Sequence, residues 1–257
     1  MRKIAIVGYG YVGKGYHKAF PEAVIYDRQI KNRDEVNACD LTIVCVSTPM
    51  MEDGRCDTSA IWDVVGWIET PLILIKSTIP PGTVDELKQK TGKRICFSPE
   101  YMGEGQYYIS PWKYPDPTNP SYHTFQIIGG DKKDGDEIVG IICEKLGPEK
   151  FYYIINAVEA EIIKYMENAW GATKVGFCQE FYDLCQVFGV SYNRVREGFL
   201  LDPRVERNHT AVFPTKRKWS GKCWPKDINA IVKRAEEKGY SMDLLKQVIK
   251  NNEKYGT

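Results

Sequence analysis

The chain has 257 residues, of which 43% are apolar and 27% are charged, so it can bury one large hydrophobic core or two ordinary ones. This composition excludes an intrinsically disordered chain and a collagen-like repeat. Lysine and arginine total 35 against 34 aspartate and glutamate residues, which gives no global field that would favour nucleic acid or an anionic membrane surface.

The first predicted strand begins at Lys3, which leaves no room for a secretory leader, so we expect a cytoplasmic protein. No apolar run approaches the roughly 20 residues that a membrane-spanning helix needs. The eight cysteines form no C-x-x-C pair and the chain has three histidines, so we predict reduced cysteines and no metal site.

Short apolar runs rich in β-branched residues alternate with helical or polar segments through the first 155 residues. This alternation predicts an α/β fold with a Rossmann-type, doubly wound, mostly parallel sheet. The predicted strands are 3–7, 23–26, 41–46, 72–75, 94–97, 125–128 and 151–155, and the predicted crossover helices are 12–20, 58–68, 83–90 and 133–146. The run 110–120 contains four prolines and is predicted to be an extended loop.

The periodicity changes at residue 158, where apolar residues begin to recur three or four apart, and this predicts one helix over 158–188. About 30 residues exceeds the usual length of ~8–20, so this helix should link two domains or pair with another subunit. A loop rich in arginine and lysine, 201–220, and helices over 225–238 and 241–252 are predicted to follow.

The stretch GYGYVG at 8–13 follows a predicted strand and opens a predicted helix, which is the context of a dinucleotide-binding fingerprint. Gly8 permits the tight turn, Gly10 lets the backbone approach a pyrophosphate, and Gly13 allows close packing of the helix. Asp27 ends the second strand, where a carboxylate can accept both ribose hydroxyls and repel a 2′-phosphate. A glycine-rich turn without a ligand is the alternative, and Arg28 leaves room for NADP. We assign residues 1–156 to an NAD-binding domain and 157–257 to a long helix followed by a small helical domain.

Cys223 stands directly before a predicted helix whose first position suits Pro225. The helix dipole together with Lys222 and Lys226 should favour the thiolate, which is the nucleophilic form. Asp227 follows four residues later, in the first turn and on the same face. The alternative is that Cys223 is an ordinary cysteine and Asp227 an ordinary acidic residue of a first helical turn.

Lys164 and Asn168 are spaced i, i+4 on the long helix, so an ammonium and an amide face the same way and could hold an oxyanion. Because Glu159, Glu161 and Glu167 surround Lys164, a solvated face of ion pairs is the alternative.

Two loops come directly after predicted parallel strands, KSTIPPGT at 76–83 and SPEYMGEG at 98–105. Such loops at the carboxyl ends of strands are where α/β sheets bind ligands. Proline and glycine also end strands for purely local reasons, which is the alternative for both loops.

Seven stretches of the chain read, in order, GYGYVG, VCVSTP, KSTIPPGT, SPEYMGEG, EAEIIKYMENAWGATKVGFCQE, LDPRV and GKCWPKD. Together they resemble the UDP-glucose 6-dehydrogenase and GDP-mannose 6-dehydrogenase family. The resemblance implies an NAD-dependent enzyme of polysaccharide biosynthesis that oxidises the C6 alcohol of a nucleotide sugar to an acid, with two successive hydride transfers to NAD.

The resemblance also implies a covalent mechanism. Cys223 would trap the aldehyde as a thiohemiacetal, which the second hydride transfer converts to a thioester. Lys164 and Asn168 would stabilise the alkoxide and the oxyanion that form along the way.

Hydrolysis of the thioester is implied to use water positioned by Asp227 and Thr78, with Glu100 as the base. Arg204 matches an arginine that reaches the substrate of the neighbouring subunit, which would make the long helix the core of a homodimer. The implied substrate contacts are Tyr101, Met102, Glu104, Lys164, Asn168, Arg204 and Gly221. The implied NAD contacts are Gly8, Gly10, Tyr11, Val12, Gly13, Asp27, Ser47, Thr48, Thr78 and Lys226.

The sequence departs from the family's pattern in two places. The glycine-rich run before the nucleophile reads PTKRKWSG at 214–221, and the chain ends at Thr257, where the family's third, nucleotide-gripping domain would begin. The expected explanations are a short form that binds another acidic group through Lys216, Arg217 and Lys218, a second chain that supplies the missing part, or an inactive remnant.

Two other functions fit part of the sequence. A two-electron β-hydroxyacid-type dehydrogenase shares the Rossmann domain and a catalytic Lys-Asn pair but needs no nucleophilic cysteine. A non-catalytic NAD-binding regulatory or scaffold protein needs only the fingerprint. The full set of matching residues favours the NAD-dependent oxidation of an alcohol to a carboxylate, with a small-molecule substrate and no nucleic-acid or membrane partner.

Overall fold

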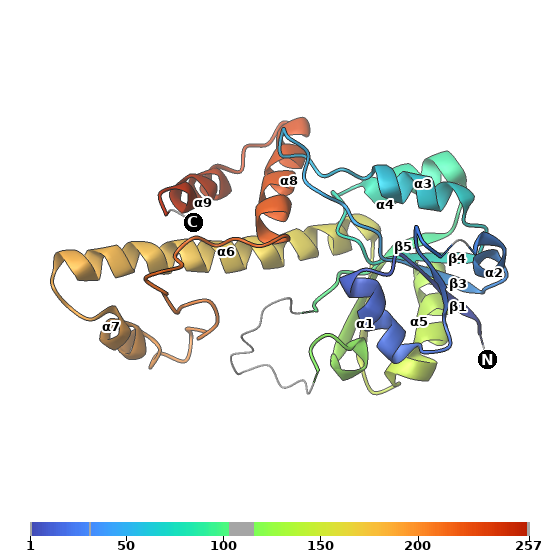
Figure 1. Cartoon of the computed structure of the whole chain (residues 1–257), viewed down its shortest axis with the longest axis horizontal. Coiled ribbons are helices and arrows are strands. Elements are labelled where there is room, and N and C mark those ends of the chain that lie inside the picture. Colours follow the sequence, from blue (N-terminus) through green and yellow to red (C-terminus); the bar gives the residue numbers. More distant parts are fainter. Residues whose placement is uncertain (1, 31, 103–115, 256–257) are drawn as a thin grey trace. The chain divides into compact units, whose positions relative to one another are not determined.

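The computed structural model of the chain describes residues 2–30, 32–102 and 116–255 (Figure 1). The chain forms two compact units. Unit 1 comprises residues 1–51 and 56–164, and unit 2 comprises residues 52–55 and 165–257. The division therefore falls inside the long helix α6 (Ala157–Val187), whereas the sequence analysis placed a boundary at 156/157.

Unit 1 is built on a seven-stranded sheet in the order β2-β1-β3-β4-β5-β6-β7. Neighbouring strands run parallel except β5 and β6, which are antiparallel. The predicted doubly wound, mostly parallel sheet is confirmed. The strand order reverses between β1 and β3, and ligands of such sheets bind at this switch point. The strands are β1 (Ile4–Val7), β2 (Val24–Tyr26), β3 (Leu41–Val44), β4 (Leu72–Ile75), β5 (Ile95–Phe97), β6 (Phe125–Gly129) and β7 (Phe151–Ile155).

The central strands carry mainly apolar residues on both faces, and helices cover both faces of the sheet and bury them. Successive strand residues point to opposite faces, so Ile4 and Ile6 of β1 belong to one hydrophobic cluster and Ala5 and Val7 to the other. The first cluster includes α1 (Tyr11–Ala19) and α5 (Lys132–Leu146), and the second includes α2 (Arg33–Asn37), α3 (Ser59–Trp67), α4 (Thr83–Thr91) and the start of α6.

Unit 2 is helical in the part of the chain that the structure describes. Small residues of α6 allow two further helices to pack against it, and the shared core consists of Ala169, Ala172, Trp219, Ile228, Val232, Leu245 and Val248. The helices are α7 (Tyr192–Phe199), α8 (Trp224–Glu237) and α9 (Asp243–Glu253). Within residues 2–30, 32–102 and 116–255, we find no helix with the length and hydrophobicity needed to cross a membrane.

Three short elements were not predicted: α2, α7 and the 3₁₀ helix η1 (Pro120–Tyr122). Val36 is the one buried residue of α2, and Tyr192 is the one buried residue of α7. Such short helices with a single buried residue show no apolar periodicity in the sequence. Of the predicted loop 110–120, residues 110–115 lie outside the described residues, and η1 begins at the last proline.

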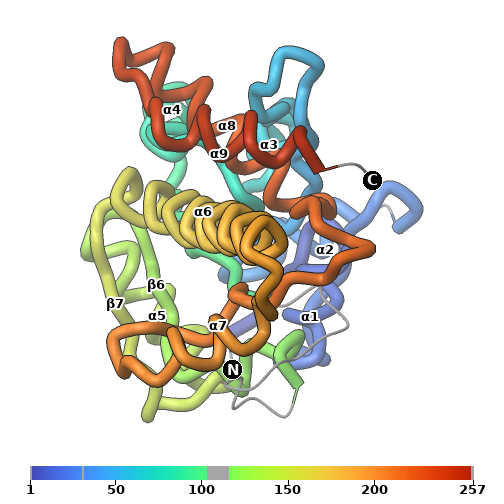
Figure 2. Tube along the Cα trace, turned by 90° about the vertical axis from the view of Figure 1, so that its left-hand side faces the viewer, coloured from blue at the N-terminus to red at the C-terminus, as the bar shows by residue number. Residues whose placement is uncertain are grey.

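The junction between β5 and β6 is narrow. The two strands share one pair in register, Phe97 with Gly129, whereas β6 and β7 lie side by side along their whole length (Figure 2). A Cβ at Gly129 would overlap Ala160, and one at Gly130 would overlap the Cys96 side chain. Glycine is therefore needed at both positions for the close approach.

A glutamate of α6 caps the N-terminus of α4. The fully buried Glu161 accepts hydrogen bonds from the backbone N–H groups of Gly82 at 2.5 Å and Val84 at 3.0 Å. The α4 N-cap residue Gly82 has no side chain that could do so. The alternative of a solvated ion-pair face is therefore wrong for Glu161, and Lys164, which is also buried, does not belong to such a face either.

Replacing Glu161 with alanine should lower the free energy of unfolding of unit 1 by about 1–3 kcal/mol, because two buried N–H donors lose their acceptor. Urea denaturation and amide hydrogen exchange of α4 would measure this loss. Glu144→Ala, an exposed glutamate of α5, is the matched control and should change stability little. Equal effects of the two substitutions would contradict the capping role.

Candidate active site

The turn between β1 and α1 brings the backbone within reach of a ligand. Gly8 has a φ of +96°, and a Cβ there would lie 2.7 Å from the carbonyl carbon of Cys45. At Gly13 a Cβ would overlap the carbonyl oxygen of Gly8, whereas at Gly10 a Cβ would meet nothing within 4 Å. α1 starts without a side-chain cap and without an acidic residue in its first turn, which contains Tyr11 and Val12. Its N–H groups and partial positive charge therefore suit a pyrophosphate.

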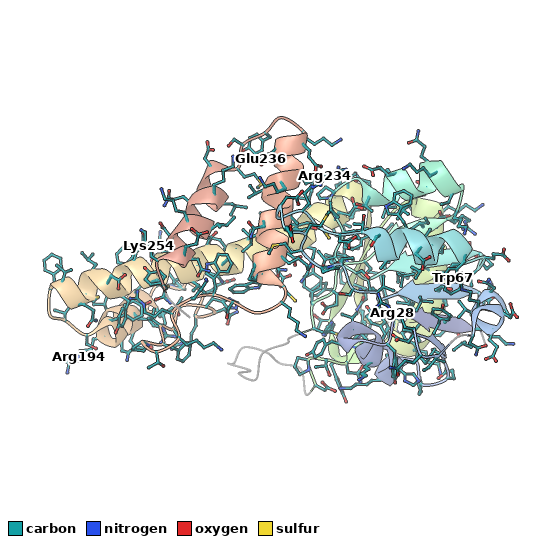
Figure 3. All side chains as sticks on the ribbon, turned by 45° about the horizontal axis from the view of Figure 1, so that its top comes forward. Arg28, Trp67, Arg194, Arg234, Glu236 and Lys254 are labelled. Atoms are coloured by element: carbon teal, nitrogen blue, oxygen red, sulfur yellow. The ribbon has the colours of Figure 1, made fainter. Side chains whose placement is uncertain are left out.

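Asp27 lies beside this turn. Its Oδ2 accepts a hydrogen bond from the backbone N–H of Tyr9 at 2.7 Å, and its Oδ1 accepts one from the backbone N–H of Arg28 at 2.7 Å. These bonds fix the carboxylate next to the glycine-rich turn, as ribose recognition requires. The Arg28 side chain is exposed (Figure 3). The residues present fit a dinucleotide.

The loops after β3 and β4 are tied to each other at the same edge of the sheet. The hydroxyl of Thr48 donates to the carbonyl oxygen of Thr78 at 2.8 Å, and the hydroxyl of Ser77 donates to the carbonyl oxygen of Val46 at 2.6 Å. Ser47 is exposed between them. Three of the predicted cofactor residues, Ser47, Thr48 and Thr78, are thus brought together.

Lys164 and Glu100 both lie in unit 1, close to the loop after β5. The Nζ of Lys164 lies 5.2 Å from the centroid of the Tyr101 ring. The backbone N–H of Met102 donates to Oε1 of Glu100. The predicted substrate residue Glu104 lies outside the described residues.

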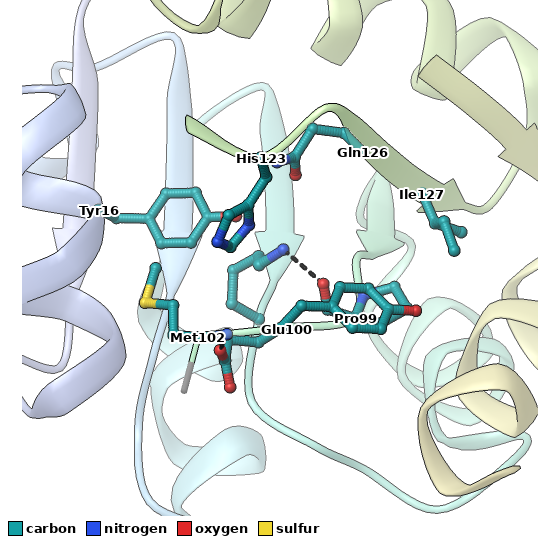
Figure 4. A pocket seen from close by; sticks show the side chains of 9 residues that line it. Tyr16, Pro99, Glu100, Met102, His123, Gln126 and Ile127 are labelled. Carbon is teal, nitrogen blue, oxygen red and sulfur yellow. Dashed lines mark hydrogen bonds between the residues drawn. The ribbon is translucent and has the colours of Figure 1, made fainter. Parts of the chain in front are cut away.

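A small pocket of unit 1 is lined by Glu100 and Met102 together with Tyr16, Lys76 and His123 (Figure 4). Burial lowers the pKa of Lys76 to about 7, although the charge of Glu100 raises it. Lys76 opens the stretch KSTIPPGT, whose sequence predicts a ligand-binding loop but no role for this lysine. A lysine that directly follows four buried apolar strand residues was the signal for a buried amine at the carboxyl edge of the sheet.

In unit 2, Cys223 is the N-cap residue of α8. The backbone N–H of Asp227 donates to the carbonyl oxygen of Cys223 at 2.8 Å, which closes the first turn. The predicted position of the thiol at a helix N-terminus is confirmed, with the difference that Trp224 opens the helix and Pro225 occupies its second position.

The Asp227 carboxylate is buried and has two partners. The Asn168 side-chain amide donates to its Oδ2 at 2.6 Å, and the ammonium of Lys226 pairs with its Oδ1. Asn168, which the sequence analysis paired with Lys164, therefore bonds to Asp227. The spacing of residues along α6 could not reveal Asp227 as the partner of Asn168, because Asp227 lies on another helix, 59 residues further along the chain.

Several other thiols are unsuited to nucleophilic chemistry. Burial raises the pKa of Cys45 and of Cys96 to about 12, and burial also raises the pKa of Cys39 and of Cys178. These four thiols are protonated at neutral pH. Cys223, by contrast, is partly exposed. Residues 2–30, 32–102 and 116–255 contain no group of three or more His, Cys, Asp or Glu side chains that could hold a metal ion.

The remaining predicted substrate residues of unit 2 lie on its surface. Arg204 has a side chain that is 88% exposed and pairs with Asp202 of the same loop. Gly221 has a φ of +97° and open space around it. Arg217 is engaged by α6, where its guanidinium bonds to Gln179 and Asp183, so it does not project as a binding group for an acidic ligand.

Two family models match the chain. The model described as "UDP-glucose/GDP-mannose dehydrogenase family, NAD binding domain" matches residues 18–113, and the model of the central domain of the same family matches residues 158–254. Among curated relatives, the UDP-glucose 6-dehydrogenase of Rickettsia prowazekii is 30% identical over 239 residues, which are 89% of this chain and 51% of the relative. The chain spans about half the length of the curated relatives it matches.

Solved structures show the same fold. A UDP-glucose dehydrogenase from Pyrobaculum islandicum aligns with a TM-score of 0.79 at 23% identity, covering 98% of this chain and 68% of that one. The 3-hydroxyisobutyrate dehydrogenase of Mycobacterium tuberculosis aligns with a TM-score of 0.68 at 15% identity, covering 99% of this chain and 93% of that one. Identities this low establish the fold alone.

NAD should bind more tightly than NADP, because a 2′-phosphate would meet the Asp27 carboxylate. Asp27→Ala should reduce the preference by about tenfold or more, which corresponds to about 1.4 kcal/mol of differential binding. Calorimetric titration with NADH and NADPH gives both dissociation constants. Asp63→Ala, an exposed aspartate of α3, is the matched control. Equal or tighter binding of NADPH by the unmodified protein would refute the role of Asp27.

Proposed function

The chain belongs to the UDP-glucose/GDP-mannose dehydrogenase family, and on that premise we propose that it oxidises a primary alcohol of a nucleotide sugar to a carboxylate. NAD is the cofactor, and it accepts the hydrides when bound. The observation that carries the proposal is the partly exposed Cys223 at the N-terminus of α8, one turn from the buried pair of Asn168 and Asp227.

Cys223 supplies the covalent step. After the first hydride leaves the alcohol carbon and the hydroxyl proton is lost, the thiolate adds to the aldehyde carbon and gives a thiohemiacetal. Loss of the second hydride from the same carbon leaves a thioester. Addition of water and departure of the thiolate then release the acid. One alcohol, two NAD⁺ and one water thus give one carboxylate, two NADH and three protons.

Lys164 and Asn168 are assigned to the negative oxygen that develops at the reacting carbon. Both are buried, so their interaction with a developing charge is weakly screened. The hydrogen bond to Asp227 orients the Asn168 amide, and the amide has a second N–H that can donate to an oxyanion.

Glu100 is assigned as the base that removes a proton from the attacking water, with Thr78 and Asp227 orienting that water. The bond from the Met102 N–H holds one carboxylate oxygen of Glu100, which limits the directions its other oxygen can take. Tyr101, Met102, Glu104 and Gly221 are proposed to contact the substrate, and Lys226 the cofactor.

We further propose a homodimer formed through α6. From Met166 onward, α6 presents large apolar side chains at spacings of three, four or seven residues, and the first two are strongly exposed, 73% for Met166 and 58% for Trp170. The other members of this stripe are Phe177, Phe181 and Leu184, and Phe188 continues it directly after the helix. Arg204, exposed and bound to Asp202 of the same chain, is assigned to the substrate of the partner subunit.

Cys223→Ser should lower the rate of acid formation by several orders of magnitude while leaving the Kd for NAD unchanged, because a serine hydroxyl does not replace the thiolate. The assay follows NADH and acid formed from UDP-glucose as probe. The unmodified protein should give two NADH for each acid.

Cys143→Ser is the matched control, since this thiol lies partly exposed on α5 and has no assigned role. Near-normal turnover of the Cys223 variant, or one NADH for each product, would favour the two-electron β-hydroxyacid-type reaction. Tight NAD binding without oxidation of any nucleotide sugar or hydroxy acid would favour a regulatory protein.

Phe181→Glu should convert the proposed dimer to monomer, because a charge in the apolar stripe would be buried without a partner on association. Multi-angle light scattering at micromolar concentration measures the mass. Gln186→Glu, on the opposite side of the same helix, adds the same charge outside the stripe and should leave the dimer intact. A monomeric unmodified protein would refute the interface and the assigned role of Arg204.

A further inference from the structure

Lys76 is a buried amine to which the proposed mechanism gives no role. It directly follows β4 and is 2% exposed. Its Nζ donates to the hydroxyl of Ser98 at 2.8 Å and to the carbonyl oxygen of Pro99 at 2.9 Å, and it lies 5.0 Å from the centroid of the Tyr16 ring. These three partners are neutral, so none of them balances an ammonium charge.

The two oxygen partners of Lys76 immediately precede Glu100 in the chain. The bond to Pro99, drawn as a dashed line in Figure 4, links the end of β4 to the loop that follows β5. On the other side of Glu100, the N–H of Met102 donates to its carboxylate. Lys76 therefore fixes the backbone from which the Glu100 side chain projects.

Charge also couples the two side chains. Burial lowers the pKa of Lys76 to about 7, the charge of Glu100 raises it, Cys45 raises it further, and Lys164 lowers it. Because burial raises the pKa of Cys45 to about 12, that thiol is neutral at pH 7. Glu100 is thus the anion that favours the charged form of Lys76.

Two further titratable groups that line this pocket, Tyr16 and His123, are neutral near pH 7, whereas Lys164 acts on Lys76 as a second cation. Burial raises the pKa of Tyr16 well above its ordinary value, so its phenol stays protonated. Burial lowers the pKa of His123, and Lys76 lowers it further. An interaction that favours the ammonium must favour the carboxylate by the same free energy, since coupling between two sites is reciprocal.

We propose that Lys76 is a positioning residue for Glu100, holding the loop that carries this carboxylate and stabilising the ionised form that a base requires. The inference rests on the proposed function, in which Glu100 accepts a proton from water. Lys76 acts through Glu100 and does not itself contact the reacting atoms.

The test measures both titrations directly. In protein labelled with ¹³C at the glutamate carboxyl and the lysine Cε, Lys76→Met should raise the titration midpoint of Glu100 by about one pH unit or more, because a nearby cation is lost. Glu100→Gln should lower the midpoint of Lys76 by the same amount. Unequal shifts, or no shift in either variant, would overturn the coupling. The second variant keeps the test valid if Lys76→Met does not fold.

Ser98→Ala is the control for a merely structural role, because it removes one hydrogen bond of Lys76 and keeps its charge. It should move the Glu100 midpoint much less than Lys76→Met does. A shift as large as that of Lys76→Met would show that loop geometry alone sets the midpoint, and would refute the electrostatic part of the proposal.

A kinetic measurement connects the coupling to the reaction. With UDP-glucose and NAD, Lys76→Met should move the acidic limb of the kcat profile upward by the shift seen in the Glu100 titration, with the KM for NAD unchanged. An unmoved limb in a variant whose Glu100 midpoint has shifted would refute the role in catalysis. Failure of the unmodified protein to reduce NAD counts against the proposed function, whereas the two titrations need no turnover and test Lys76 separately.

Discussion

Three polar side chains along one face of α6 are buried, and each therefore needs a hydrogen-bonding or electrostatic partner. The proposed site depends on which partners they have. Glu161, Lys164 and Asn168 are spaced three and four residues apart, so they share that face. Glu161 caps α4, Lys164 lies over the Tyr101 ring, and Asn168 bonds to Asp227. An unsatisfied buried polar group costs about 1–3 kcal/mol, so within unit 1 these partners fix the start of α6 beside α4 and the loop after β5, and within unit 2 the Asn168 bond fixes α6 beside α8.

The sequence predicted those parts of the molecule whose conformation depends on neighbouring residues alone. The strands were found because short apolar runs, such as IAIV and LILI, are bounded by glycine, proline and charge. The long helix was found from its apolar period, and the position of Cys223 from Pro225, which suits the start of a helix. The fingerprint glycines were found because only glycine tolerates the contact that Gly8 makes with Cys45.

The sequence did not reveal which polar groups meet across the fold. Asn168 and Asp227 are hydrogen-bonded although 59 residues separate them along the chain, and Lys76 and Ser98 are bonded across 22 residues. Contacts between residues this far apart produce no periodic pattern in the sequence. One of the three explanations for the short chain has Lys216, Arg217 and Lys218 bind an acidic group, yet Arg217 bonds to α6. The sequence shows which side chains are charged, but tertiary packing decides which group each of them pairs with. The apolar period of α6 is visible in the sequence, and the structure adds which of its residues are exposed.

Because the junction between β5 and β6 is narrow, the segment on one side of it should open more easily than the rest of unit 1. Since a single register pair joins these strands, β6, α5 and β7 share few backbone hydrogen bonds with the remainder of the sheet. The apolar packing of α5 and the ion pairs of its Asp134 and Glu137 with Arg94 hold this segment in place. Such a segment is a natural cooperative unit for sub-global opening, in which one piece unfolds while the rest keeps its structure. The glycine-rich turn, Asp27 and the loops after β3 and β4 all lie on the other side of this junction, so dinucleotide binding would stabilise that side more than β6, α5 and β7.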